Sequence, residues 1–462
     1  MAFSSPTLHK RFKFTEREEE DSTTEPQQEF GGLRCPIEEV ITVSYVREKA
    51  ELQEIEALVE YAVIKNAKNL IDVEILKGIK NPRVRLYFTP QRLRVYCAYT
   101  YERRAECYDE PDKILESHFS QKNSDTQGPF FTQDFEQFKQ WVIEELQPLT
   151  IPQKLVANFT FETGEEFEVI KFHQKEPTFW RDFHLPYQYY LFIDIENTLI
   201  IEDSPYWKLY CLFEVKEDSK VLIGFTTISK SYHNLHKFRA RISQFIILPD
   251  YQKKGLGYQL FDIIYSRFMA NPECFEITLE SPTFVMSKIY NQCVLKTLLK
   301  QGQLSKLMNS DHEFIQVDDT NLLTVFQRSN EEMQAMGTAV KCELVCCCRI
   351  YEFLIYNLIA EDDKNTKEKL KEYVKKRLFI EFHQDFMPNQ RFKRLRESEN
   401  RIKAPYCVCY EQDGEEAVIN PSQDIKEINI DYGIVYSKLE IFYGVFLDQA
   451  KDLAGIKQKL LS

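Results

Sequence analysis

Gln252-Lys253-Lys254-Gly255-Leu256-Gly257 is the stretch that decides the fold of this chain. The apolar run 242–248 precedes it and predicts a buried strand, and residues 258–270 follow with helical periodicity. A glycine-containing turn in that position aims backbone N–H groups, together with the positive end of the helix dipole, at one point. The pattern therefore predicts a site for a phosphate group between strand and helix.

The surrounding sequence places this turn inside a dense α/β segment. The expected order is a strand pair, a hairpin, the central strand with its turn and helix, another strand and a last helix. The ranges are 159–171 for the strand pair, 209–215 and 221–228 for the hairpin, 242–248, 258–270, 275–280, and Pro282 to about 300. Because proline suits the first helical turn, Pro282 is expected to open the last helix.

The regions on either side of this segment differ in character. Residues 46–67 show helical periodicity, 84–88 and 93–99 alternate like strands, and 131–146 form an amphipathic helical pattern. After 303 the pattern becomes helical, with 342–360 and 367–379 as the best candidates. We therefore expect five regions. They are a flexible leader (1–36), an N-terminal α/β domain (37–150), a catalytic core (151–303), a helical domain (304–404) and an extension without a functional interpretation (405–462).

Composition narrows the classes of partner. The 462 residues carry a formal net charge of -13, which disfavours nonspecific nucleic-acid binding and favours basic partners such as a lysine-rich peptide. No apolar run approaches the roughly 20 residues that span a bilayer, so no membrane segment is expected. The start of the chain shows no secretory signal. Acidic proteins are common, however, so the charge alone identifies no partner.

The 12 cysteines indicate a reducing compartment, since consecutive Cys346-Cys347-Cys348 do not resemble a disulfide framework. Cys342 and Cys346 lie one helical turn apart, and Cys407 and Cys409 follow far downstream. Neither pair has the C-x-x-C spacing of a zinc site. Buried helical thiols are therefore favoured over zinc, and we expect no metal.

Glu280 is the candidate general base. It ends an apolar strand directly before Ser281-Pro282, where its carboxylate can face a cleft. Forming an amide from a thioester requires a neutral amine, and deprotonating a lysine at neutral pH costs about 4 kcal/mol. Glu196, among apolar neighbours, is a second candidate carboxylate. The alternative for Glu280 is an ordinary strand-end or helix-capping glutamate, and without the glycine turn that alternative would be favoured.

Taken together, these residues resemble the catalytic subunit of type B histone acetyltransferases, within the GCN5-related N-acetyltransferase (GNAT) superfamily. The superfamily's acetyl-CoA signature is Q-x-x-G-x-G after a short apolar strand. The matching residues are 241–248, then Tyr251, Gln252, Gly255, Gly257, Gln259 and Leu260, then Ile277, Thr278, Glu280 and Pro282, with Ile195-Glu196, Trp207, 349–352 and 375–378. The resemblance runs from roughly Val73 to His383 and is strongest between Phe161 and Lys300.

The resemblance implies a mixed α/β fold with a GNAT core and direct acetyl transfer from acetyl-CoA to lysine in a ternary complex. It assigns catalysis to Glu280 with help from Glu196, and main-chain coenzyme binding to Phe245, Ile246 and Ile247. The implied pyrophosphate loop consists of Gln252, Lys253, Lys254, Gly255, Leu256, Gly257 and Tyr258, with Lys288 near the coenzyme. Ser281 stands where the family usually has aspartate. Tyr290, close to the superfamily's usual proton-donating tyrosine, fits a core residue better.

The implied substrate is the tail of newly made core histone four, together with histone three. The family's usual partner is a WD-repeat histone chaperone, and its expected location is nucleus and cytoplasm. Two alternatives stay open. One is the same chemistry on another amine, such as a protein N-terminus or a polyamine. The other is a non-catalytic histone-binding scaffold that keeps the coenzyme fold.

Overall fold

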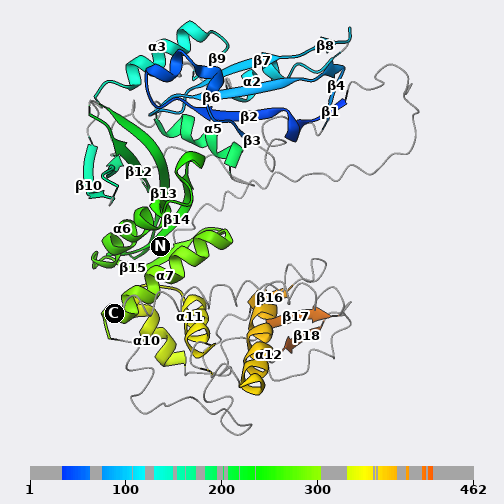
Figure 1. Ribbon diagram of the computed structural model, residues 1–462. Helices are drawn as coiled ribbons and strands as arrows, with labels where there is room; N and C mark the ends of the chain where they lie inside the picture. Colours follow the sequence, from blue (N-terminus) through cyan, green and yellow to red (C-terminus); the bar gives the residue numbers. More distant parts are fainter. Residues whose placement is uncertain are drawn as a thin grey trace, which may run out of the picture. The chain divides into compact units, whose positions relative to one another are not determined.

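The protein forms two compact units in a computed structural model (Figure 1). The first unit contains Met1–Glu144 and Pro186–Ile200, and the second contains Glu145–Leu185 and Ile201–Ser462. The structure describes residues 34–62, 75–106, 108–119, 130–148, 153–161, 163–172, 183–194, 201, 206–217, 219–234, 236–302, 330–356, 359, 363–381, 392–394, 408–412 and 415–419.

The first unit is built on a five-stranded mixed sheet, shown in blue and cyan in Figure 1. In spatial order its strands are β3 (Tyr61–Ala62), β2 (Ile41–Tyr45), β6 (Arg83–Phe88), β7 (Val95–Thr100) and β9 (Phe131–Thr132). The pairs β2–β6 and β7–β9 are parallel, and the other two are antiparallel. Two smaller pairs join β1 (Arg34–Pro36) to β4 (Ile75–Lys77) and β5 (Ile79–Lys80) to β8 (Arg103–Arg104).

The helices of this unit are α2 (Pro111–Phe119), α3 (Phe135–Glu145) and most of α5 (Leu185–Asp194). The predicted amphipathic helix is α3, and Asp134 caps it by accepting a hydrogen bond from Glu136 N at 2.9 Å. Phe138, Trp141 and Val142 of α3 are buried.

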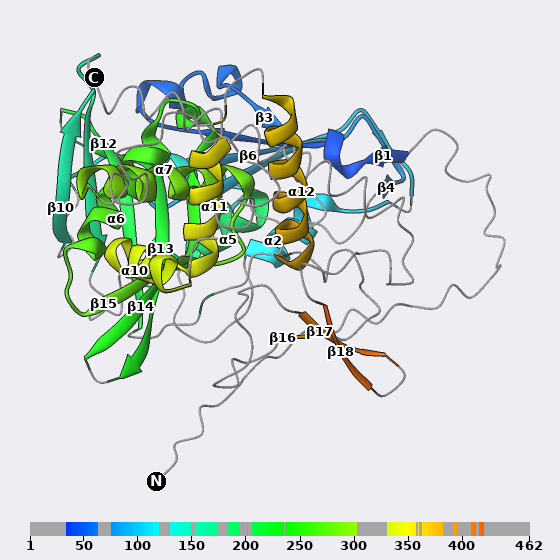
Figure 2. The same cartoon turned by 90° about the horizontal axis from the view of Figure 1, so that it is seen from below.

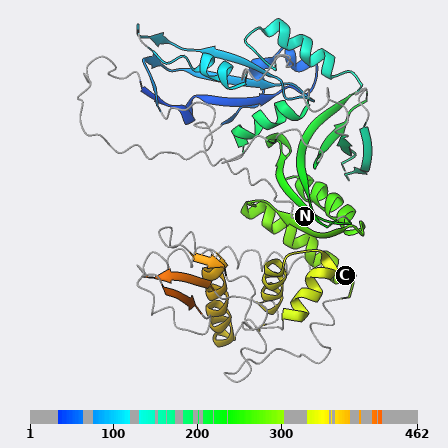
Figure 3. The ribbon, with the colours of Figure 1, turned by 180° about the vertical axis from the view of Figure 1, so that it is seen from behind.

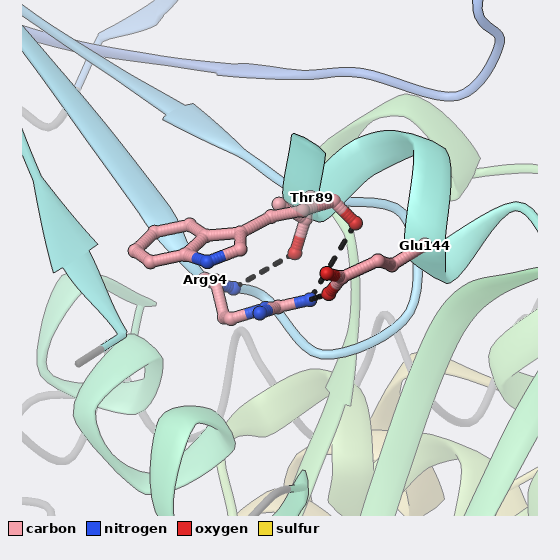
Figure 4. A network of polar contacts seen from close by, with 4 residues as sticks. Thr89, Arg94 and Glu144 are labelled. Carbon is pink, nitrogen blue, oxygen red and sulfur yellow. Dashed lines mark hydrogen bonds and ion pairs between the residues drawn. The ribbon is translucent and has the colours of Figure 1, made fainter. Parts of the chain in front are cut away.

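A polar contact closes the β6–β7 turn onto α3 (Figure 4). Arg94 N donates to Thr89 Oγ1 at 2.9 Å, and Arg94 Nη2 lies 3.3 Å from Glu144 Oε2. The guanidinium also lies 4.9 Å from the centre of the Trp141 ring, so charge and stacking act together.

The prediction of a helix over 46–67 is wrong for the residues of that range that the structure describes. Residues 46–62 form two short 3₁₀ turns (Ala50–Leu52 and Ile55–Ala57) and strand β3 instead. The Glu51 carboxylate accepts the main-chain N–H groups of both Arg47 and Glu48, which stabilises a turn there. Pairing of β3 with β2 then keeps the chain extended, so tertiary contacts override helix propensity. Residues 63–67 lie outside the described residues.

The second unit contains a six-stranded sheet in the consecutive order β10-β11-β12-β13-β14-β15. Its strands are β10 (Gln153–Thr160), β11 (Glu166–Phe172), β12 (Trp207–Val215), β13 (Lys220–Asn234), β14 (Lys237–Ile247) and β15 (Cys274–Leu279). Every neighbouring pair is antiparallel except β14–β15, which is parallel. The predicted strand pair, hairpin and central strands of the core are therefore confirmed.

Two helices cover one face of this sheet, as Figures 1 and 2 show from two directions. They are α6 (Leu256–Met269) and α7 (Phe284–Lys300), and Thr283 caps α7 by accepting from Met286 N at 3.3 Å. The helices start within two residues of their expected positions. Their apolar faces bury Leu260, Phe261 and Ile264 from α6 against Phe238, Ala240 and Ile242 of β14.

Three further helices belong to the same hydrophobic core: α10 (Asn330–Val340), α11 (Leu344–Tyr356) and α12 (Lys364–Glu381). They confirm the helical character predicted after residue 303. Beyond them a small antiparallel sheet, orange in Figure 3, joins β16 (Phe392–Arg394), β17 (Val408–Gln412) and β18 (Glu415–Ile419). For the extension, the sequence also predicts a strand-like run at 433–436 and a final amphipathic helix, and both lie outside the described residues.

Lys341 connects the α10–α11 turn to the core. It has a left-handed backbone (φ 53°), and its ammonium donates to the carbonyls of Phe268, Met269 and Asn271 at 2.6–3.0 Å. Its own carbonyl accepts Ile277 N of β15 at 2.7 Å. The turn thereby satisfies groups at both the end of α6 and the edge of β15.

At the start of the chain, Arg34–Pro36 form β1, so the expected leader is three residues too long at its carboxyl end. Residues 1–33 lie outside the described residues. Among the helices that the structure describes, none is long and apolar enough to cross a membrane.

Candidate functional site

The site is built where β14 and β15 part. Their parallel pairing runs only from Phe238 with Cys274 to Ile242 with Leu279, and Glu280 N then donates to Ile242 O at 2.9 Å. Beyond this point β14 continues to Ile247 and pairs only with β13. One edge of residues 243–247 is therefore left for an extended ligand to pair with, as an added strand would.

Phe245, Ile246 and Ile247, the predicted main-chain binding residues, all lie on this unpaired edge segment of β14. One of their carbonyls is already used, since Gln252 Nε2 donates to Ile247 O at 2.8 Å. Gln252 thus ties the turn to the end of the strand. Its side chain has a structural role besides the ligand-binding one that the sequence suggested.

The glycine turn has the geometry that its sequence predicts. Gly255 is the N-cap residue of α6 and has a left-handed backbone with φ 83°, and Lys253 has φ 62°. A Cβ placed at Gly255 would meet no atom within 4 Å, so the space beside the helix start is open. The first backbone N–H groups of α6 lack intrahelical partners, which makes the open space suited to a phosphate.

The other loop residues surround this opening in different ways. Leu256 is buried and anchors the helix start, whereas Lys253 is exposed. The Lys254 ammonium lies 4.8 Å from the centre of the Tyr251 ring, and Tyr251 Oη donates to Glu214 Oε2 at 2.6 Å. Lys254 is therefore held against the loop while Lys253 faces water.

Gly257, Tyr258 and Lys288 lie on the two helices beside the opening. A Cβ at Gly257 would make only ordinary contacts, the nearest 3.5 Å from Ile247 Cγ1. Tyr258 is half-buried in the first turn of α6, and burial raises the pKa of its hydroxyl. Lys288 is half-buried on α7, the helix that packs against α6.

Gly224 of β13 is a site residue that the sequence analysis missed. It lies opposite Ile247, and a Cβ there would stand 2.4 Å from Ile246 O and 2.7 Å from Ile247 Cδ1. Only glycine lets β13 support the open segment of β14 so closely. A glycine inside a strand pattern was the available signal, because it marks close backbone approach.

Glu280 follows β15 directly at the point of divergence, and its side chain is exposed. Ser281 next to it has φ 43°, a left-handed conformation that turns the chain sharply toward α7. Arg241 Nη1 lies 3.9 Å from Glu280 Oε1, with both side chains about half exposed. The carboxylate thus lies at the mouth of the opening, next to one guanidinium.

Buried hydroxyls without a partner among the described residues lie around the same divergence: Thr226, Ser243 and Thr278. Thr226 is on β13 opposite Phe245, and Thr278 is on β15 opposite Arg241. A buried hydroxyl without a partner is costly, so these three groups mark the divergence of β14 and β15 as a place where the fold gives up hydrogen bonds. They give no signal in the sequence, since isolated Ser and Thr in strands are common.

Tyr290 is a core residue in this structure, as the sequence favoured. Its Oη donates to Ile277 O at 2.6 Å, and burial raises its pKa well above the usual value. Glu196 lies outside the described residues. Cys346, Cys347 and Cys348 are buried, and the described residues contain no group of three or more His, Cys, Asp or Glu that could hold a metal ion.

Two family models match the chain. Residues 170–283 match the acetyltransferase (GNAT) family, and residues 33–196 match the histone acetyl transferase HAT1 N-terminus. The second unit therefore contains a GNAT acetyltransferase domain, whose fold implies acetyl-CoA as cosubstrate. The predicted α/β fold class with a GNAT core is confirmed.

Among curated proteins, similarity is to catalytic subunits of type B histone acetyltransferase. The one from Schizosaccharomyces pombe is 33% identical over 33% of this chain and 40% of its own length. The one from Yarrowia lipolytica is 33% identical over 24% of this chain and 29% of its own length. One from Dictyostelium discoideum is 25% identical over 66% of this chain and 64% of its own length. The chain thus spans less than two thirds of each of these relatives.

Residues 33–283 thus resemble a HAT1-type N-terminal region followed by a GNAT acetyltransferase domain. The predicted resemblance to type B histone acetyltransferases is thereby confirmed.

Proposed function

We propose that this chain is a type B histone acetyltransferase that transfers the acetyl group of acetyl-CoA to lysine side chains of newly made core histones. The observation that carries the proposal is the opening where β14 leaves β15, with the Gly255 turn at one side and Glu280 at its mouth. The names of the similar proteins and the two matching family models support it.

The described residues fit the coenzyme. The unpaired edge of residues 243–247 suits its amide-bearing arm, and the start of α6 suits its pyrophosphate. Bound there, acetyl-CoA supplies an acetyl thioester. The chain's part is to orient that arm along β14, hold the phosphates at Gly255, and bring the acceptor amine to Glu280.

Glu280 acts as the general base in this proposal. A lysine ammonium must lose a proton before its nitrogen attacks, and at neutral pH that costs roughly 4 to 5 kcal/mol. A carboxylate within hydrogen-bond reach accepts the proton and contributes roughly 10² to 10⁴ in rate. The proposal includes no covalent relay, since eight of the nine cysteines whose side chains the structure describes are buried and Cys35 lies in the first unit. Transfer is therefore direct, in a ternary complex.

Two neighbours modify this role. Arg241 Nη1, 3.9 Å from Glu280 Oε1, can help to orient the carboxylate. Ser281 replaces the acidic neighbour usual in the family, so Glu280 carries the base role without an adjacent carboxylate. Glu196 is proposed as a second acidic residue that helps to position the amine.

The proposed substrate is the amino-terminal tail of histone four, together with histone three. A net charge of -13 supports a basic tail as substrate by long-range attraction. A WD-repeat histone chaperone is the proposed partner, and nucleus and cytoplasm are the proposed locations.

The test is acetyl transfer from labelled acetyl-CoA to a core histone mixture, with wild type, Glu280→Gln and Glu273→Gln compared. Glu273, exposed in the loop before β15, is the matched control. Label on histone four, at least about 100-fold slower with Glu280→Gln and unchanged with Glu273→Gln, is expected. Coenzyme A affinity should be the same for all three proteins.

Three results would redirect the assignment. Equal rates for Glu280→Gln and wild type would remove Glu280 as the base. Label on a small amine or a protein N-terminus but not on histones would favour another acceptor. Coenzyme binding without transfer to any acceptor would favour the non-catalytic scaffold.

A further inference from the structure

A second site lies at the opposite end of α6 from the glycine turn. A surface cavity of about 510 Å³ opens there, lined by Val156 of β10 and by Ile263, Ser266, Arg267, Ala270 and Asn271 at the end of α6. Strand β10 and helix α6 lie beside each other in Figure 2. This volume is in the range that small-molecule ligands occupy.

Arg267 is the basic residue of the cavity wall, and the lysines near it lie beside the cavity rather than in its lining. Tyr210 connects them, because the Lys171 ammonium lies 6.0 Å from the centre of its ring and Arg267 forms a hydrogen bond with its side chain. Lys171 of β11 experiences the charges of Arg267 and of three further lysines, Lys154, Lys208 and Lys230. They come from β10, β11, β12, β13 and α6, so the fold gathers them from five separate elements. In a protein of net charge -13, such a concentration of one sign is unusual. We call these five residues the basic cluster.

Four of the five residues of the basic cluster lack a carboxylate partner among the described residues. Within the part of the chain that the structure describes, Lys154, Lys171, Lys230 and Arg267 form no ion pair with a carboxylate. Burial and then the neighbouring cations lower the pKa of Lys171 to about 8. Burial, followed by Lys230, also lowers the pKa of Lys208. Aromatic rings offset part of this repulsion, since the Lys230 ammonium lies 3.9 Å from the centre of the Phe238 ring and that of Lys171 lies 6.0 Å from the centre of the Tyr210 ring. A bound anion would offset the remainder.

A structural role at the carboxyl end of α6 does not explain the basic cluster. Cations commonly stabilise helix carboxyl ends by meeting the last carbonyls. Here Lys341 already donates to Phe268 O, Met269 O and Asn271 O, and Lys237 donates to Pro272 O at 2.8 Å. Five more cations beside these contacts add repulsion rather than satisfy carbonyls.

We propose that the cavity at the carboxyl end of α6 binds a small multivalent anion of the phosphate class, held by Arg267 and Lys171. Arginine matches phosphate oxygens with paired N–H groups, and lysine adds a point charge. The other three lysines favour a ligand with several negative charges. This site is separate from the glycine turn, and the proposal does not depend on the proposed acetyl transfer.

The partly lowered pKa of Lys171 gives the site a pH signature. A bound anion stabilises the protonated amine of Lys171. Above about pH 8 the amine of the free protein is mostly neutral, so binding of the anion must then be accompanied by uptake of a proton. Affinity should then fall by up to about tenfold between pH 7 and pH 9. The groups that face Lys171 and contribute are Lys208, Arg267, Lys230 and Lys154. Arginine stays charged over this range, so Lys171→Arg should remove most of the dependence.

The experiment is calorimetric titration of the full chain with inorganic tripolyphosphate, in the presence of saturating coenzyme A. The same titration without coenzyme A shows whether the coenzyme, which also carries phosphates, competes for the cavity. Binding is expected to weaken by about tenfold or more in both Lys171→Gln and Arg267→Gln. Lys300→Gln, an exposed change at the end of α7, is the matched control and should bind as wild type does.

The pH comparison completes the test. The ionisation of tripolyphosphate depends on pH in the same way whichever protein is titrated. A difference between wild type and Lys171→Arg in how affinity changes with pH is therefore due to Lys171. No binding of tripolyphosphate, either with or without coenzyme A, would overturn the proposal. Equal binding by wild type, Lys171→Gln and Arg267→Gln would do the same, because the probe would then bind elsewhere. A melting temperature within a few degrees of wild type shows that each variant is folded.

Discussion

Both ends of α6 are proposed to bind an anion, but the two ends offer it opposite backbone groups. At the amino end, the chain offers backbone N–H groups around Gly255, and the neighbouring lysines only supplement them. At the carboxyl end, backbone carbonyls repel anions, and Lys341 already satisfies several of them. An anion can be held there only by side-chain cations, and the basic cluster supplies them.

This difference has a consequence for how each end tolerates change. A backbone site depends on conformation, so substitutions that alter glycine geometry should damage it and charge changes should matter little. A side-chain site depends on charge, so the reverse should hold. Substitutions at Gly224, Gly255 and Lys171 test this contrast, in order of decreasing expected effect.

The largest effect is expected for Gly224→Val. The new Cβ would stand 2.4 Å from Ile246 O, so β14 must move, at a cost of about 3 kcal/mol in the free energy of unfolding. Coenzyme A binding should be lost with the displaced strand. Chemical denaturation and calorimetry measure both quantities. Gly257→Ala, with only ordinary Cβ contacts, should unfold like wild type. Equal stability of the two variants would show that β13 can yield at Gly224.

An intermediate effect is expected for Gly255→Ala. The left-handed backbone at φ 83° disfavours alanine by about 1 kcal/mol, although the space beside it is open. Coenzyme A affinity should fall several-fold, and tripolyphosphate binding in the presence of the coenzyme should stay unchanged. Gly255→Asn should lose less, since asparagine tolerates this conformation. If tripolyphosphate binding fell in parallel, the two ends of α6 would not be independent sites.

The smallest effect is expected for Lys171→Gln, and it concerns the free energy of unfolding of the protein without ligand. Burial and like charges lower the folded-state pKa of Lys171 to about 8, below the usual value of 10.5. The unfolded chain therefore binds more protons between these values, and wild-type stability should rise from pH 8 to pH 10.5. Below pH 8 the charged amine destabilises the fold, so Lys171→Gln should be more stable there, by no more than about 1 kcal/mol.

The difference between wild type and Lys171→Gln should shrink above pH 10. Denaturant unfolding at pH 7, 9 and 10.5 measures it. A variant less stable than wild type at pH 7 would show that Lys171 makes favourable contacts that outweigh the repulsion.

The sequence predicted the amino end of α6 well because that site is local. A strand, a glycine turn and a helix follow one another within residues 242–270, and backbone geometry dictates glycine at Gly255. The position of Glu280 after β15 was predictable for the same reason. The proposed roles of Glu280 and Lys288 stay predictions, and Glu196 lies outside the described residues.

The features that the sequence did not predict depend on distant contacts. The basic cluster comes from five elements between Lys154 and Arg267, and no local pattern brings them together. Gly224 is required only because β14 runs beside it across the sheet, where Ile247 lies opposite and Ile246 O would stand 2.4 Å from a Cβ. The helix expected over residues 46–67 failed similarly, because pairing of β3 with β2 is invisible to periodicity.

The contacts of Lys341 limit where this protein can be divided. The matched acetyltransferase region ends at residue 283, yet Lys341 caps α6 and its carbonyl hydrogen-bonds to β15. A fragment ending after α7 would leave three carbonyls at the end of α6 and the Ile277 N–H without these partners. The acetyltransferase domain, as a unit that folds, therefore extends at least to the α10–α11 turn.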